Sequence, residues 1–168
     1  MSSNFVASVC FSSDGKQIAS GSSWDKTVKI WNASSGELQS TLTGHNGYVP
    51  AFPCSACIQV VVFAHYPVTS RSVYCVGFDP SGKKLVSGSG DQIVKVWSIG
   101  SSGTFECEST LNVDGSISSL DFSPCGTKIA AACNDYDNDK YTVKILGSSS
   151  ESAGTFECKS TLTGHSNR

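Results

Sequence analysis

The chain has 168 residues, of which 39% are hydrophobic and 15% charged, with a formal net charge of −2. This composition is too apolar and too weakly charged for a disordered polypeptide, and the length allows one sizeable domain core. Because the sequence has no basic patch that would grip phosphate, direct binding of nucleic acid is not expected.

The N-terminal sequence and the cysteines bear on the compartment. Residues 1–11 carry neither a basic head nor a long apolar stretch, so a signal peptide is not expected. The longest apolar stretch, from Ile58 to Tyr66, is too short to cross a bilayer. We therefore expect an intracellular protein, cytoplasmic or nuclear, that has no membrane partner and keeps its eight cysteines reduced.

The first part of the chain predicts four short strands joined by tight turns. Val6 to Phe11 is the first strand, and Ser12 to Gly15 is a turn whose glycine is free to take a positive φ. Gln17 to Gly21 is the second strand. Thr27 to Trp31 alternates and is rich in β-branched residues, which indicates a third strand, and Glu37 to Leu42 is the fourth.

The same frame occurs three times, over residues 6–45, 73–111 and 117–165. Each copy contains V/I-x-x-V/L-x-F, a four-residue turn with Gly, K/Q-x-I/L/V-A/S, an Asp-bearing turn, and T/I-V-K-I/V-W/L. A single four-stranded sheet of this size cannot bury both of its faces and must stack on the next copy. The repeats predict an all-β chain with units at 1–46, 73–115 and 116–165, the third of them degenerate.

The runs SGSSWDKTVKIW, TLTGH and SGSGDQIVKVW resemble the WD-repeat β-propeller family, and the resemblance extends over most of the chain apart from about 49–72 and the ends. It implies that each copy is a propeller blade of four antiparallel strands, set radially around a channel. Complete propellers usually have four to eight blades, so three blades predict an open arc. Either the natural protein is longer, or self-association closes the ring, or the isolated arc is poorly stable.

The resemblance also implies a structural hydrogen-bond network that joins a histidine, a hydroxyl, an aspartate and a tryptophan. In blade two, His45 would supply the imidazole, Ser87 or Ser89 the hydroxyl, Asp91 the carboxylate and Trp97 the indole. We expect this network to be buried and structural.

The other two blades depart from that pattern. Blade one has Asp25 and Trp31, but no Gly-His pair precedes it. Blade three has Asp114 where the histidine is expected and Leu146 where the tryptophan is expected. The network is therefore expected to be incomplete at both ends of the arc.

Residues 47–72 break the repeat period. Phe11 and Phe78 are 67 positions apart, whereas Phe78 and Phe122 are 44 apart. Three interpretations stay open: a loop at the propeller rim with a strand near 58–63, intron sequence retained in a gene model, or a metal or redox element built on Cys54 and Cys57. The last lacks a second C-x-x-C, and a zinc site needs four ligands.

For function, the sequence favours a non-catalytic scaffold that binds other proteins or peptides. Exposed aromatic side chains near turns are the best candidates for such contacts, and here these are Trp24, Tyr48, Tyr74 and Tyr136. A truncated or degenerate propeller fragment without independent function is the alternative.

An enzyme is the third hypothesis, and the sequence does not favour it. His45 and Asp91 could suggest a catalytic dyad, but the structural network explains both residues. Asp135, Asp137 and Asp139 alternate as in a calcium loop, yet the glycine and glutamate of that loop are missing. No catalytic residue, metal ligand or cofactor is therefore predicted.

Overall fold

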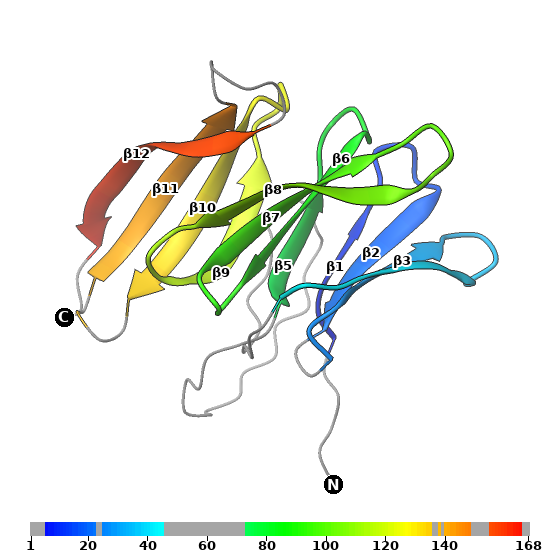
Figure 1. Ribbon diagram of the computed structural model, residues 1–168, viewed down its shortest axis with the longest axis horizontal. Helices are drawn as coiled ribbons and strands as arrows, with labels where there is room; N and C mark the ends of the chain where they lie inside the picture. Colours follow the sequence, from blue (N-terminus) through cyan, green and yellow to red (C-terminus); the bar gives the residue numbers. More distant parts are fainter. Residues whose placement is uncertain are drawn as a thin grey trace, which may run out of the picture.

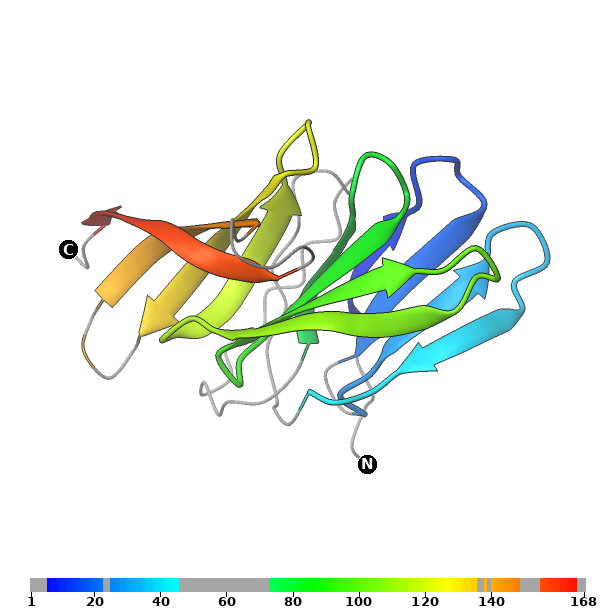
Figure 2. The ribbon, with the colours of Figure 1, turned by 45° about the horizontal axis from the view of Figure 1, so that its top comes forward.

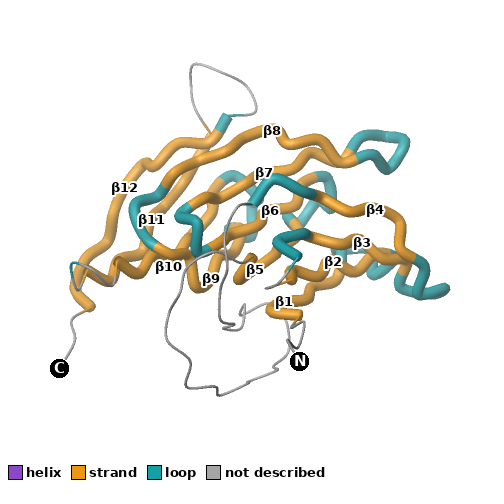
Figure 3. The backbone as a smooth tube through the Cα atoms, turned by 60° about the horizontal axis from the view of Figure 1, so that its bottom comes forward, coloured by secondary structure: helices purple, strands orange, loops and turns teal. Residues whose placement is uncertain are grey.

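The computed structural model describes residues 6–22, 25–45, 73–135, 138, 140–148 and 155–165. All regular structure in these residues is β, arranged as three four-stranded antiparallel sheets (Figure 1). The backbone tube shows the same strands with no helix among the described residues (Figure 3). None of these residues forms the long apolar helix that a membrane crossing requires.

Blade one confirms the four strands expected from the sequence to within one residue at each end. Its strands are β1 (Val6–Phe11), β2 (Gln17–Ser22), β3 (Val28–Asn32) and β4 (Leu38–Leu42), paired in chain order. The β1–β2 turn has Gly15 at a φ of 69°, as its position in the turn predicts. Alternation of branched and polar side chains therefore suffices to place these strands.

Blades two and three repeat this meander. Blade two contains β5 (Val73–Phe78), β6 (Lys84–Ser89), β7 (Ile93–Ile99) and β8 (Phe105–Asn112). Blade three contains β9 (Ser116–Phe122), β10 (Lys128–Asp135), β11 (Lys140–Ser148) and β12 (Phe156–His165). The predicted insertion at 47–72 lies outside the described residues.

The three sheets lie side by side in chain order (Figures 1 and 2). Their first strands are neighbours, since β1 contacts β5 and β5 contacts β9. Each sheet covers one face of the next sheet, so the outer faces of blades one and three have no sheet packed on them. The three blades therefore form the open arc that the number of repeats predicts.

Two faces of each blade must be distinguished. In blade two, Val76, Leu85 and Trp97 lie on one face of the sheet, which we call the front face. Val86 and Val96 lie on the opposite face, which we call the back face. The front face packs on blade one in a single buried cluster whose other members are Cys10, Ala19, Val28, Ile30, Leu42 and Val73. The equivalent faces of blades one and three follow from the strand register.

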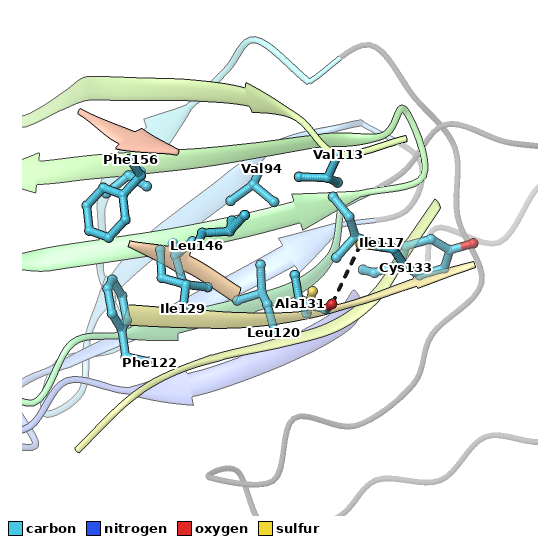
Figure 4. Packing of buried hydrophobic residues seen from close by; sticks show 14 residues of the cluster. Val94, Val113, Ile117, Leu120, Phe122, Ile129, Ala131, Cys133, Leu146 and Phe156 are labelled. Carbon is cyan, nitrogen blue, oxygen red and sulfur yellow. Dashed lines mark hydrogen bonds between the residues drawn. The ribbon is translucent and has the colours of Figure 1, made fainter. Parts of the chain in front are cut away.

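The back face of blade two packs on blade three in the same way. The buried cluster here includes Val94, Val113, Ile117, Leu120, Phe122, Ile129, Leu146 and Phe156, with side chains from both sheets pointing toward one another (Figure 4). Gly88 allows this approach, because a Cβ on it would lie 2.7 Å from side-chain atoms of Ile117 and Leu120. The same interface is therefore built twice.

Candidate functional site

The side chains of His45, Ser87 and Trp97, three of the residues predicted for a network, meet at the front face of blade two. Ser87 Oγ accepts a hydrogen bond from Trp97 Nε1 at 2.9 Å and lies 2.8 Å from His45 Nε2. Ser87 is completely buried, and His45 and Trp97 are each 5% exposed. The structure thus brings a residue of the segment after β4 onto strands β6 and β7, and it selects Ser87 rather than Ser89 as the bridging hydroxyl.

Asp91 contacts His45 at a longer distance than Ser87 does. Its Oδ2 lies 3.4 Å from His45 Nδ1, but the geometry is not that of a hydrogen bond. Because Ser87 Oγ already accepts from the indole, its own hydrogen is free to point to His45 Nε2. In the tautomer in which Nε2 accepts that hydrogen, the imidazole proton is on Nδ1, 3.4 Å from the Asp91 carboxylate.

Ser89 and Asp91 also hold the β6–β7 turn. Ser89 Oγ accepts from the backbone N–H of Asp91 at 3.2 Å, and Asp91 Oδ1 accepts from the backbone N–H of Ile93 at 3.1 Å. Gln92, which lies between Asp91 and Ile93, has a φ of 68°. The carbonyl of Gln92 accepts from the backbone N–H of Val113 at 2.9 Å, which ties this turn to the link toward blade three. The side chains therefore fix a turn that the backbone alone would not favour.

Blade one has an equivalent serine–tryptophan pair, to which no histidine among the described residues bonds. Ser20 Oγ accepts from Trp31 Nε1 at 2.8 Å, which matches the Ser87–Trp97 bond. Trp31 is among the residues predicted for the network, whereas Ser20 is not, although Ser20-Gly21-Ser22 aligns with Ser87-Gly88-Ser89 in sequence. A short hydroxyl opposite the tryptophan is thus a feature of two blades.

Asp25 holds the turn before β3. Its Oδ1 accepts from both the backbone N–H and the hydroxyl of Thr27, at 3.1 and 2.8 Å, and its other oxygen lies 3.7 Å from Lys29. Partial burial raises the pKa of Asp25, but hydrogen bonds from Thr27 and Ser22 outweigh it and hold the pKa below its usual value. Asp25 therefore stays ionised and keeps the turn in place.

Blade three has different residues at the positions of the network. Ala131 stands where Ser87 stands in blade two, and Leu146 takes the place of the tryptophan, completely buried. Asp114 makes an ion pair of 3.0 Å with Lys144, whose side chain is 11% exposed. Burial raises the pKa of the neighbouring Cys133 thiol to about 11. Blade three thus has apolar side chains at the positions of Ser87 and Trp97, and one ion pair, between Asp114 and Lys144, beside them.

Of the four aromatic side chains predicted to contact partners, the structure describes one, and that one is buried. Tyr74 is 2% exposed and lies in the cluster between blades two and three. A bulge in β5 between Val73 and Cys75 places it there, and its hydroxyl accepts from Ser116 Oγ at 3.3 Å. This position corrects the expectation of an exposed contact. Trp24, Tyr48 and Tyr136 lie outside the described residues.

Within the described residues, no group of three His, Cys, Asp or Glu side chains is placed to hold a metal ion. The described cysteines are thiols. Cys54 and Cys57, the basis of the metal or redox interpretation, lie outside the described residues.

A family model decides the affiliation of the chain. The model of the WD domain, G-beta repeat, matches residues 2–32, 55–98 and 105–138, which together make up more than half of the sequence. The chain belongs to the WD-repeat family. Propellers of this family are generally protein-interaction scaffolds and generally non-catalytic. The second match begins inside the stretch predicted as an insertion.

Curated relatives agree with this assignment. The chain is 31% identical over 122 residues to the periodic tryptophan protein 2 homolog of Schizosaccharomyces pombe, covering 72% of this chain and 11% of that protein. It is 31% identical over 118 residues to the small ribosomal subunit protein RACK1y of Oryza sativa subsp. japonica, covering 70% of this chain and 27% of that protein. This WD-repeat chain therefore spans a small part of the length of each relative.

Solved structures show the same fold. A chain in the crystal structure of the mitotic checkpoint complex superposes with a TM-score of 0.68 at 23% identity, over 97% of this chain and 40% of that one. The β-propeller domain of Myceliophteria thermophila Cps50 (Swd1) gives a TM-score of 0.57 at 18% identity, over 86% and 36%. The three sheets of this chain thus match a part of each of these two chains.

Proposed function

We propose that this chain is a non-catalytic WD-repeat platform that binds other proteins or peptides. The observation that carries the proposal is the state of the His45–Ser87–Asp91 set. A serine nucleophile must be reachable by its substrate, but Ser87 is completely buried and its oxygen is occupied by the Trp97 indole. The one histidine–serine–aspartate set in the described residues therefore supports a turn and is unsuited to catalysis.

The surface that this network supports is the binding surface of the proposal. We call it the network end: the edge of the blades that carries Lys26, Gln92 and Asp114, each in a turn with a positive φ. Side-chain hydrogen bonds or ion pairs hold the turns that contain these residues. Turns that are already ordered lose little entropy on binding, which favours recognition of a partner.

The partner class and the compartment belong to the same proposal. We infer a protein or peptide partner, no cofactor, and no direct contact with nucleic acid or membrane. The net charge of −2 supports the exclusion of nucleic acid. Thiols in the described residues and a relative that is a small ribosomal subunit protein support an intracellular site, cytoplasmic or nuclear.

Peptides displayed on phage provide the test. Binders selected against the purified chain are measured by calorimetry on the wild type and on two charge reversals. Lys26→Glu alters the network end, whereas the control Lys16→Glu alters the β1–β2 turn at the opposite edge, where the Lys16 side chain is 82% exposed. We expect Lys26→Glu to weaken binding at least tenfold and Lys16→Glu to leave it unchanged. Equal effects, or no binder tighter than about 100 μM, would contradict the proposal.

A further inference from the structure

Each blade carries a lysine at the same position of its third strand. These lysines are Lys29 in β3, Lys95 in β7 and Lys144 in β11, each directly after a valine. By strand register they lie opposite Ser20, Ser87 and Ala131 on one side and opposite Thr41, Thr110 and Thr161 on the other. The surroundings of the three ammonium groups can therefore be compared directly.

Two of the three lysines pair with a carboxylate of this chain. Lys29 Nζ lies 3.7 Å from Asp25 Oδ2, in the turn before the lysine's own strand. Lys144 Nζ lies 3.0 Å from Asp114 Oδ2, in the link that leads from the preceding blade. A lysine at this position can thus reach a carboxylate from either of two places.

The turn before β7 does not supply a carboxylate to Lys95. Asp91 stands four residues before Lys95, as Asp25 stands four residues before Lys29. Asp91 Oδ2, however, lies 3.4 Å from His45 Nδ1, and its other oxygen accepts from the backbone at the turn. The carboxylate that could neutralise Lys95 therefore faces the histidine instead.

The link from the preceding blade does not supply a carboxylate either. His45 holds the position after β4 that Asp114 holds after β8. Its Nε2 lies 2.8 Å from Ser87 Oγ, so the ring is bound at the front face of blade two. Lys95 is therefore left without a carboxylate at both places from which the equivalent lysines obtain one.

Neutral groups hold the Lys95 ammonium in place. Its Nζ donates to Thr110 Oγ1 at 3.1 Å, lies 3.9 Å from Cys107 Sγ, and is 5.8 Å from the centre of the Trp97 ring. Thr110 and Cys107 are exposed, so the ammonium lies beside solvent. An ammonium has three N–H donors, of which the hydroxyl and the thiol use two. An ordered cation with a free donor loses little entropy when it pairs with a ligand.

We propose that the partner of this chain is an acidic peptide segment, one of whose carboxylates pairs with Lys95 beside the outer strand of blade two. The inference rests on the proposed function and names the chemistry of the partner. Lys95 lies three residues after Gln92 of the network end, and the exposed Lys26 offers a second positive charge on the same end. The two internal pairs show that a carboxylate suits a lysine at this position.

The attraction is local, because the chain as a whole has a net charge of −2. A peptide with a few carboxylates near Lys95 gains from this cation, whereas a highly acidic peptide is repelled by the rest of the surface. We expect a dissociation constant on the order of micromolar that rises as salt is added, since ions screen an exposed pair.

Peptides selected on phage from an unbiased library provide the first test. Each binder is synthesised, and its Asp and Glu residues are replaced one at a time by Asn and Gln. In each binder, we expect one replacement to weaken binding to the wild-type chain about three- to tenfold in calorimetry. Binders that tolerate every replacement would overturn the acidic partner, yet the proposed function would stand if Lys26→Glu still weakened them. A library without binders would contradict both proposals.

Variants of the chain locate the contact. Lys95→Met removes the charge but keeps an unbranched side chain, and we expect it to weaken the same peptides about three- to tenfold. Lys128→Met, the matched control, removes the same charge from the exposed start of β10 at the opposite edge and should leave binding unchanged. Lys95→Arg keeps the charge and should bind more tightly than Lys95→Met. Equal binding by the two methionine variants would overturn the role of Lys95.

A double-mutant cycle joins the two sets of variants. The replacement of the critical carboxylate by an amide should cost nothing further in Lys95→Met, because the pair is already broken. Losses that simply add would place the carboxylate elsewhere and overturn the pairing. A single-stranded RNA of mixed sequence is titrated as well. If the RNA bound the wild type more tightly than the peptides and lost affinity in Lys95→Met, Lys95 would be a phosphate contact and the proposal would be wrong.

Discussion

Replacing Trp97 by alanine removes the largest side chain at the interface of blades one and two. Trp97 is 5% exposed, packs among apolar side chains of both blades, and donates its indole N–H to Ser87. A tryptophan buries roughly 200 Å², which at about 25 cal/mol per Å² corresponds to about 5 kcal/mol. We expect Trp97→Ala to lower the free energy of unfolding by about 3–5 kcal/mol, the usual cost of emptying such a site.

Trp31 provides the matched control for this prediction. It donates the same hydrogen bond, to Ser20 at 2.8 Å, but it lies on the uncovered front face of blade one. Its removal opens a space that water can fill, so no closed cavity remains and we expect a loss of only about 1–2 kcal/mol. Urea unfolding followed by circular dichroism measures both losses.

A third variant separates packing from hydrogen bonding. Trp97→Phe keeps an aromatic ring at the site but removes the indole N–H, and we expect it to cost about 1–2 kcal/mol. It also yields a folded protein if Trp97→Ala is too unstable to purify. The reasoning fails if Trp97→Ala and Trp31→Ala cost the same, since burial by the neighbouring blade would then contribute nothing.

Three further predictions concern other contacts. Gly88→Ala should destabilise the chain by about 1–3 kcal/mol because its Cβ would lie 2.7 Å from atoms of blade three, whereas Gly77→Ala, with 3.8 Å of room, should be tolerated; thermal melts compare them. Ser87→Ala should cost about 1–3 kcal/mol in urea unfolding, because the buried indole and imidazole lose their shared partner. Hydrogen bonds from neighbouring hydroxyls lower the pKa of the exposed Cys125 thiol to about 7, so iodoacetamide should label Cys125 increasingly as the pH rises through 7 and at a constant rate above about 8. Burial raises the pKa of Cys133 to about 11, so Cys133 should stay unlabelled in the native state. Equal labelling of the two thiols at neutral pH would contradict both assignments.

Much of the fold could be predicted because its signals are local. Alternating branched residues place β3 at Val28–Asn32, and the glycine-containing turn before β2 has the predicted positive φ at Gly15. Repetition of this frame then requires stacking, because one small sheet leaves an apolar face exposed. The resemblance of the motifs to WD repeats indicated which residues were candidates for a network.

The polar contacts and the burial of individual side chains depended on the tertiary structure. The sequence offers Ser87 and Ser89 as equal candidates, and the contacts of Ser87 with the Trp97 indole and with His45, 42 residues away, distinguish them. Tyr74 is buried because a bulge in β5 places it against blade three, and the pairing of Asp114 with Lys144 spans 30 residues. Strand patterns are set by neighbours along the chain, whereas these contacts arise where separate blades meet.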